Sequence, residues 1–155
     1  MKIATPTGGD ILGMVDISGK ENVERIAVAE GKIRLSEESI KAIKEKKVKK
    51  GDVFAIAEAA ALMAIKRTFL AIPHCHPLPV TSASVEFFIE GNDVVSRCMV
   101  KASYKTGVEM EALHGVMVAL LTIWDMVKYM EKDEQGQYPA TLIHGIRVIE
   151  KRKGE

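Results

Sequence analysis

Hydrophobic and polar residues alternate in the middle of the chain. Apolar side chains occupy every second position from residue 83 to residue 89, and they alternate with Ser82, which precedes them, Ser84 and Glu86. This period of two predicts a half-buried strand over residues 81–89. Gly91 and Asn92 are typical of a hairpin turn, so a second, paired strand is predicted over Asp93–Tyr104.

A helical period follows this predicted hairpin. Thr106 and Glu109 have the spacing of a capping box, which places the start of a long helix there. Its end is predicted near Gly136 and Pro139. The apolar positions recur three or four residues apart, as in the buried face of a helix: Leu113, Val116, Leu120, Ile123 and Val127.

The first half of the chain contains one predicted strand and two predicted helices. Residues 23–35 favour a strand, and Ser36 is a suitable N-cap for a helix over residues 36–47. Asp52 caps a second, alanine-rich helix that should continue to residue 71, before Pro73. Residues 140–150 form the last predicted strand.

Apart from the short helix after Ser36, the predicted order is strand, helix, strand, strand, helix, strand. This order predicts an α+β, ferredoxin-like split βαβ fold, with an antiparallel sheet and helices on one face. We expect an irregular arm over residues 1–20, one catalytic domain over residues 21–150 and a charged tail over residues 151–155. The bare sheet face suggests a homo-oligomer.

Composition narrows the class of protein. With 22 Lys and Arg against 21 Asp and Glu, the chain offers no strong field to nucleic acid, so no nucleic-acid partner is expected. Two cysteines are too few for a disulfide framework, and no secretion leader is recognisable. Charged residues interrupt every long apolar run, so we expect no membrane span and a cytoplasmic protein.

The segment HCHPLPV at residues 74–80 contains three side chains that can bind zinc, His74, Cys75 and His76. A structural zinc site needs four ligands, and no CxxC or HExxH companion is present, so no metal site is expected. His76, held between Cys75 and Pro77, could instead serve in hydrogen bonding or proton transfer. Simple satisfaction of backbone groups in a proline-stiffened loop is the remaining alternative.

Glu109 and Glu111 lie at the predicted start of the long helix, with Met110 between them. Residues two apart on a regular helix point about 200° apart. One of the two carboxylates is therefore structural, or the pocket extends across the helix end. Lys105 and the free N–H groups after Gly107 also make this end a candidate anion site.

Asp125 and Lys128 are three apart, which places them on one face near the other end of the helix. They form either a surface ion pair or an acid/base couple. Lys50, fixed before Gly51, could bind phosphate or act as an acid. The 14 residues from Glu111 to Asp125 span about 21 Å of helix, so the substrate is long or the site combines two subunits.

Six ordered motifs resemble the cyclic pyranopterin monophosphate synthases, the MoaC family of molybdenum cofactor biosynthesis. They are MVDIS at 14–18, KGDVFAIA at 50–57, KRT at 66–68, HCHPLP at 74–79, KTGVEMEAL at 105–113 and TIWDMVK at 122–128. The resemblance implies a ferredoxin-like fold and a hexamer built as a trimer of dimers, with active sites at subunit interfaces. It also implies a lyase that converts 3′,8-cyclised 7,8-dihydro-GTP to cyclic pyranopterin monophosphate and diphosphate.

By this resemblance, Lys50 and Lys128 are the catalytic acid/base pair and Asp125 is their orienting partner. No cofactor is expected, with magnesium left open. His74 receives no separate role within its segment, because many members carry an apolar residue there. The residues expected to bind substrate are His74, Cys75, His76, Glu109, Met110, Glu111, Lys66 and Arg67.

The C-terminal end departs from the family pattern. Many members end in a glycine and lysine segment, whereas this chain ends RVIEKRKGE. Lys151 or Lys153 is a candidate replacement for a phosphate contact. Two rival functions remain open, a metal-dependent hydrolase using the segment 74–76 and a noncatalytic nucleotide-binding regulatory domain.

Overall fold

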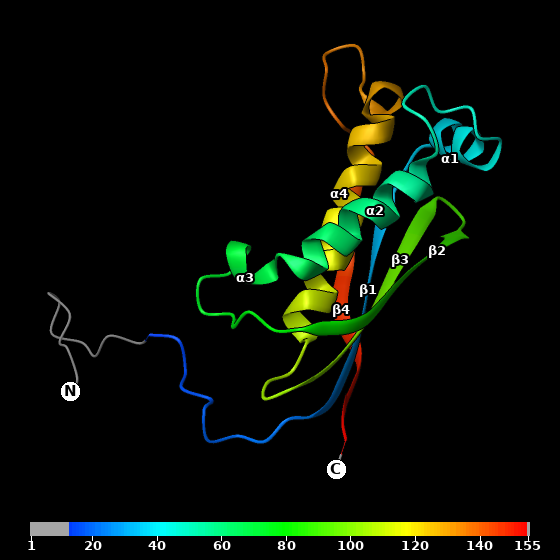
Figure 1. Ribbon diagram of the computed structural model, residues 1–155. Coiled ribbons are helices and arrows are strands. Elements are labelled where there is room, and N and C mark those ends of the chain that lie inside the picture. The colour runs from blue at the N-terminus through cyan, green and yellow to red at the C-terminus, as the bar shows by residue number, and fades with distance from the viewer. Residues whose placement is uncertain (1–12, 155) are drawn as a thin grey trace, which may run out of the picture.

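Four antiparallel strands form one sheet in the order β2-β3-β1-β4, as the computed structural model of residues 13–154 shows (Figure 1). The predicted α+β, ferredoxin-like fold with an antiparallel sheet is therefore confirmed. The elements are β1 (Val23–Arg34), α1 (Glu37–Lys44), α2 (Val53–Lys66), α3 (Thr68–Ala71), β2 (Val80–Glu90), β3 (Asp93–Tyr104), α4 (Glu109–Glu131) and β4 (Leu142–Lys153).

Alternate residues of the central strands form the floor of the core. Ala27, Ala29 and Ile33 of β1 are fully buried, as are Val94 and Val100 of β3. Helices α2 and α4 cover this face of the sheet (Figure 1). The inward-facing residues of the strands therefore form one side of the core, and the apolar face of α4 forms the other.

The two helices approach each other closely at Gly115 of α4. A Cβ atom at this position would lie 2.8 Å from Ile65 Cγ1 and 3.2 Å from Cys98 Sγ. Only a residue without a side chain allows the end of α2 to pack here. Burial also raises the pKa of the Cys98 thiol to about 12, consistent with a small core residue.

Two of the predicted helix caps are confirmed. The Ser36 hydroxyl accepts a hydrogen bond from Ser39 N at 3.2 Å, and Asp52 Oδ1 accepts one from Ala55 N at 3.1 Å. The capping box at Thr106 and Glu109 is wrong, because the N-cap of α4 is Val108, which makes no side-chain cap. The Glu109 carboxylate binds Lys151 instead.

The helix predicted to continue to residue 71 is interrupted at Arg67, and a separate short helix, α3, follows. The Thr68 hydroxyl donates to the carbonyl oxygens of Ala64 and Ile65, which satisfies the end of α2. Such side-chain bonds compete with continuation of the helix.

Helix α4 ends at Glu131, earlier than predicted, because Lys132 is extended and Asp133 organises a turn. Strand β4 continues to Lys153, so three residues of the predicted tail pair with β1. Most of the predicted arm, residues 1–12, lies outside the described residues, as does Glu155.

By length and composition, α4 is the one described helix that could cross a membrane, and half of its most apolar window is buried inside the fold. Val116, Leu120 and Ile123 of α4 are fully buried against the sheet and α2. The apolar character of α4 is therefore that of a core helix.

Candidate functional site

Lys50, Asp125 and Lys128 form one cluster near the C-terminal end of α4. Lys50 Nζ lies 3.1 Å from Asp125 Oδ2, and Lys128 Nζ lies 3.1 Å from Asp125 Oδ1. The two ammonium groups therefore share one carboxylate, each through a different oxygen. All three side chains are accessible to a ligand, with 40–58% of their surface exposed.

The carboxylate of Asp125 is held in its charged form. Hydrogen bonds from Lys128 and Lys50 lower the pKa of Asp125, and the charges of the two lysines add to this effect. Lys50 Nζ also donates to the Asp125 backbone carbonyl at 2.9 Å. The helix backbone thus contributes to the position of this lysine.

Glu109 lies at the other end of α4. Its Oε1 is 2.5 Å from Lys151 Nζ, because Lys151 pairs with Ala27 of β1 and shares its helix-facing side of the sheet. Burial raises the pKa of Glu109, but the hydrogen bond from Lys151 and the charges of Lys151 and Arg25 outweigh it, and the net pKa is lowered. Gly107 leaves room for the carboxylate, since a Cβ there would collide with it.

Glu111 differs from Glu109 in its environment. It is only 4% exposed, and burial together with the charge of Glu109 raises its pKa. Cys75 lies close enough to Glu111 for the carboxylate charge to add to burial in raising the pKa of the thiol. The predicted divergence of the two glutamates on a helix is confirmed, since one pairs with β4 and the other enters the interior.

The histidine segment lies at this same end of the molecule. His76 Nε2 donates to the Val15 carbonyl at 2.6 Å, which ties residues 74–76 to the segment before β1. His74 is exposed, and so is Met110 at the start of α4. Among residues 13–154, no group of three or more His, Cys, Asp or Glu side chains could hold a metal ion, which gives the rival hydrolase no ligand set there.

Lys66 and Arg67 are exposed at the C-terminal end of α2. Ile65 of α2 packs against Gly115 of α4, so these two cations lie toward the Glu109 end. Lys50, which precedes α2, lies at the opposite end. One chain therefore places its expected substrate-binding residues at one end of α4 and its expected catalytic cluster at the other.

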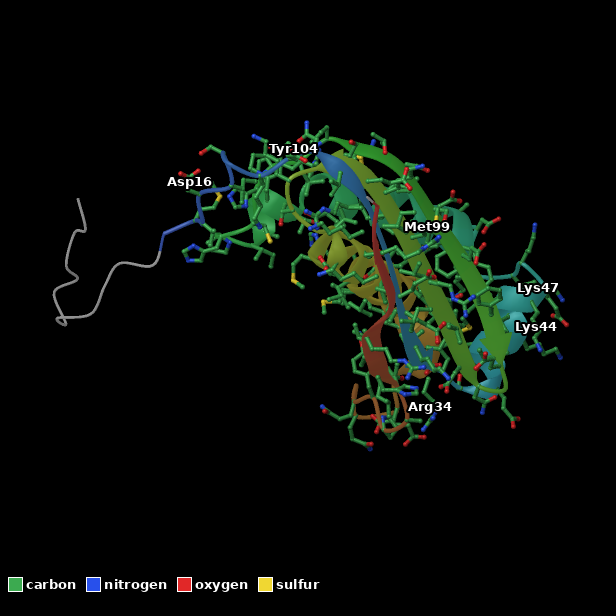
Figure 2. The ribbon with its side chains drawn as sticks, turned by 90° about the horizontal axis from the view of Figure 1, so that it is seen from below. Asp16, Arg34, Lys44, Lys47, Met99 and Tyr104 are labelled. Atoms are coloured by element: carbon green, nitrogen blue, oxygen red, sulfur yellow. The ribbon has the colours of Figure 1, made fainter. Side chains whose placement is uncertain are left out.

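Figure 2 shows the separation of these two ends along the sheet. Asp16, next to the Val15 carbonyl that holds His76, lies near Tyr104 at one end. Lys47, in the loop that carries Lys50, lies near the opposite end.

Arg25 and the contact of Lys151 with Glu109 were not assigned from the sequence. The alternating face of β1 indicates where Arg25 lies, but only pairing of β1 with β4 brings Lys151 to α4. Arg25, Lys20 and Lys153 line a cavity of about 330 Å³ at this end. The structure thus adds cations to the half of the site that contains Glu109.

Comparison with known proteins shows the family to which this chain belongs. The MoaC family model matches residues 14–154. A protein of Archaeoglobus fulgidus, named a probable cyclic pyranopterin monophosphate synthase, is 60% identical over 91% of this chain and 90% of its own.

Two further relatives are similar over most of their length. One from Thermococcus kodakarensis has the same name and is 56% identical over 92% of this chain and 91% of its own. One from Methanothermobacter thermautotrophicus is named a probable cyclic pyranopterin monophosphate synthase accessory protein and is 54% identical over the whole of this chain and 98% of its own. The chain belongs to the MoaC family.

Proposed function

We propose that this protein is a cyclic pyranopterin monophosphate synthase, a lyase of molybdenum cofactor biosynthesis that acts in the cytoplasm. Its substrate is the 3′,8-cyclised dihydro-GTP, and its products are cyclic pyranopterin monophosphate and diphosphate. The observation that carries the proposal is the shared contact of Lys50 and Lys128 with Asp125. The names of the relatives support it.

The reaction needs protons delivered and removed at nitrogen and oxygen as one ring opens and another closes. Lys50 and Lys128 supply the ammonium and amine groups for these transfers, and Asp125 orients them. Neither lysine has a second carboxylate contact among the described ion pairs. Loss of a proton from one lysine leaves the other to pair with Asp125.

The departing diphosphate needs cations that stabilise its developing charge. Lys66 and Arg67 are the residues we assign to this task. His76, Cys75, Glu109, Met110 and Glu111 line the same end of the molecule and position the substrate. No cofactor is required in this scheme.

A homo-oligomer, a hexamer built as a trimer of dimers, would place the Lys50 end of one subunit against the Glu109 end of another. Two observations support this proposal. Within one chain the two ends are separated by about 21 Å of α4. Between them, Met117 and Leu121 of α4, one turn apart, are 45% and 62% exposed, and Met63 of α2 is 42% exposed, so apolar surface is available there for a subunit contact.

The test is incubation of the purified protein with enzymatically generated 3′,8-cyclised dihydro-GTP, followed by assay of both products. Lys50→Ala is the test variant, and Lys44→Ala is the matched control, because Lys44 is an exposed lysine of α1. We expect product from the wild type and from Lys44→Ala, with little from Lys50→Ala. Binding of the substrate without product from the wild type would favour a noncatalytic nucleotide-binding role.

A further inference from the structure

The segment that presents Lys50 to Asp125 is the loop over residues 45–52, between α1 and α2. Val48 anchors its middle in the core, and Asp52 caps α2 at its end. Gly51 N donates to the Val48 carbonyl at 3.1 Å, and its φ of 114° suits a residue without a side chain. Between these anchors, Lys49 and Lys50 are exposed.

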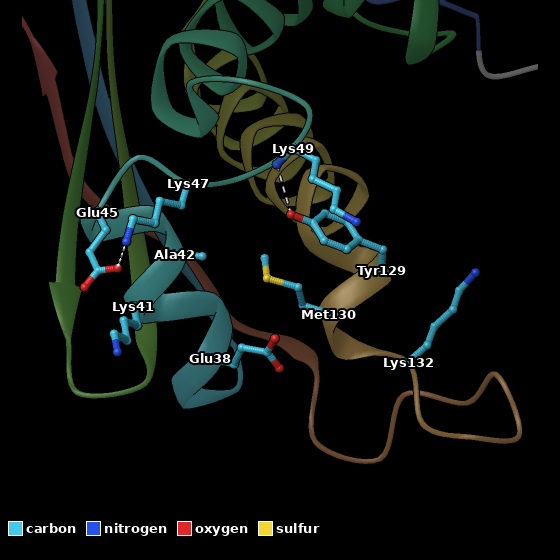
Figure 3. A pocket seen from close by; sticks show the side chains of 9 residues that line it. All are labelled: Glu38, Lys41, Ala42, Glu45, Lys47, Lys49, Tyr129, Met130 and Lys132. Carbon is cyan, nitrogen blue, oxygen red and sulfur yellow. Dashed lines mark hydrogen bonds and ion pairs between the residues drawn. The ribbon is translucent and has the colours of Figure 1, made fainter.

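Tyr129 of α4 holds the backbone of this exposed part. Its phenol oxygen accepts a hydrogen bond from Lys49 N at 3.0 Å, and Lys49 Nζ lies 5.2 Å from the centre of its ring (Figure 3). The bond joins a residue adjacent to Lys50 to a residue adjacent to Lys128. Lys49 and Tyr129 also line a cavity of about 600 Å³ between α1 and α4.

Tyr129 and Asp125 are four residues apart, so they lie one turn apart on the same face of α4. Asp125 binds the ammonium end of Lys50, through both its carboxylate and its carbonyl. Tyr129 binds the backbone one residue before Lys50. One face of α4 therefore fixes both ends of a side chain that would otherwise be free to move in solvent.

We propose that Tyr129 is a positioning residue that keeps Lys50 in place beside Asp125 and Lys128 through its hydrogen bond to Lys49 N. This inference rests on the proposed function of Lys50. An exposed lysine has many rotamers, and proton transfer requires its Nζ within hydrogen-bond reach of the reacting atom. By holding the backbone at Lys49, the Tyr129 hydroxyl reduces the number of positions that the Lys50 ammonium group can reach.

Tyr129→Phe isolates the hydroxyl, because phenylalanine retains the ring beneath Lys49 Nζ. Tyr138→Phe is the matched control, since the ring of Tyr138 packs edge-on against Trp124. We expect Tyr129→Phe to lower kcat about fivefold, the equivalent of one hydrogen bond, with little change in KM. Amide hydrogen exchange over residues 46–51 should be faster in Tyr129→Phe and unchanged in Tyr138→Phe.

A double-mutant comparison separates positioning of Lys50 from general destabilisation. If Tyr129 acts through Lys50, Tyr129→Phe should have no further effect on residual turnover in the Lys50→Ala background. A fivefold loss in that background too would overturn the inference. The inference would also be overturned if Tyr129→Phe had the same kcat and exchange rates as an active wild type. A wild type that forms no product would instead overturn the proposed function itself.

Discussion

Lys50 and Asp125 are 75 residues apart in sequence and meet through two separate hydrogen bonds. Lys50 Nζ donates to the Asp125 carbonyl at 2.9 Å and to its carboxylate at 3.1 Å. Because the carbonyl belongs to the backbone of α4, this contact does not depend on the carboxylate charge alone. The helix therefore acts as a fixed reference for the position of the lysine.

Asp125→Asn tests the importance of the shared carboxylate. The amide has no charge with which to pair Lys50 and Lys128, so we expect kcat to fall about 100-fold or more. The melting temperature should change little, because Asp125 is exposed. Steady-state kinetics and thermal unfolding check both parts, with Glu58→Gln on the surface of α2 as the control. Full activity in Asp125→Asn would contradict an orienting role.

Lys151→Gln should raise the pKa of Glu109. In the wild type the hydrogen bond and charge of Lys151 outweigh burial and lower this pKa. A carboxylate with a lowered folded pKa adds stability above its unfolded pKa and loses it as the pH falls through the folded pKa. Titration of the Glu109 carboxyl carbon by NMR measures the change, with Lys132→Gln at the far end of α4 as control. An unchanged titration would mean that the ion pair is not formed in solution.

Glu131→Gln should destabilise the fold. The buried Glu131 carboxylate accepts hydrogen bonds from Ser36 N at 3.0 Å, from the Ser36 and Ser39 hydroxyls, and from Thr141 Oγ1 at 2.8 Å. It therefore holds the start of α1 to the end of α4. We expect a loss of roughly 2–4 kcal/mol in the free energy of unfolding at neutral pH.

The difference in free energy of unfolding between the wild type and Glu131→Gln should depend on pH. Burial raises the pKa of Glu131, but its hydrogen bonds from serine and threonine lower it overall. The greater stability of the wild type is therefore present above the unfolded-state pKa of Glu131, and it decreases as the pH falls through the folded-state pKa of this residue. Urea unfolding over a pH series, with exposed Glu134→Gln as control, checks this. A difference that stays constant on acidification would contradict it.

Gly115→Val should destabilise the packing of α2 on α4. The added side chain would have to displace Ile65 and Cys98, at a cost of about 1–3 kcal/mol. Gly19→Ala is the control, because a Cβ there meets nothing within 4 Å. Denaturant unfolding measures both, and Ile65→Ala in the Gly115→Val chain should restore part of the loss. Equal stabilities for the two single variants would show that the helices separate without cost.

Mixed oligomers test the proposal that two subunits share one site. Lys128→Ala and Glu111→Gln alter opposite ends of α4, so each variant alone should be nearly inactive. In a random mixture of subunits across two-fold interfaces, about a quarter of the sites would contain neither change. Co-expressed chains should therefore regain turnover in the same assay. A mixture no more active than its parents would place all the residues of a site in one chain.

Local sequence determined most of the secondary structure. The period of two over residues 81–89, the turn at Gly91 and the caps at Ser36 and Asp52 all depend on nearby residues, and the structure confirms them. The pairing of Asp125 with Lys128 was also predictable, because helical spacing brings residues three apart together.

Contacts between distant segments decided where some helices end and which charged residues meet. Thr68 interrupts α2 through its bonds to the helix end, and Glu109 binds Lys151 only because β4 pairs beside β1. Lys50 reaches Asp125 because α1 and its loop are held against the end of α4 by Glu131 and Tyr129. Periodicity fixes which face of an element is buried, but the tertiary structure alone decides which charged ends meet, since those contacts join residues far apart in the chain.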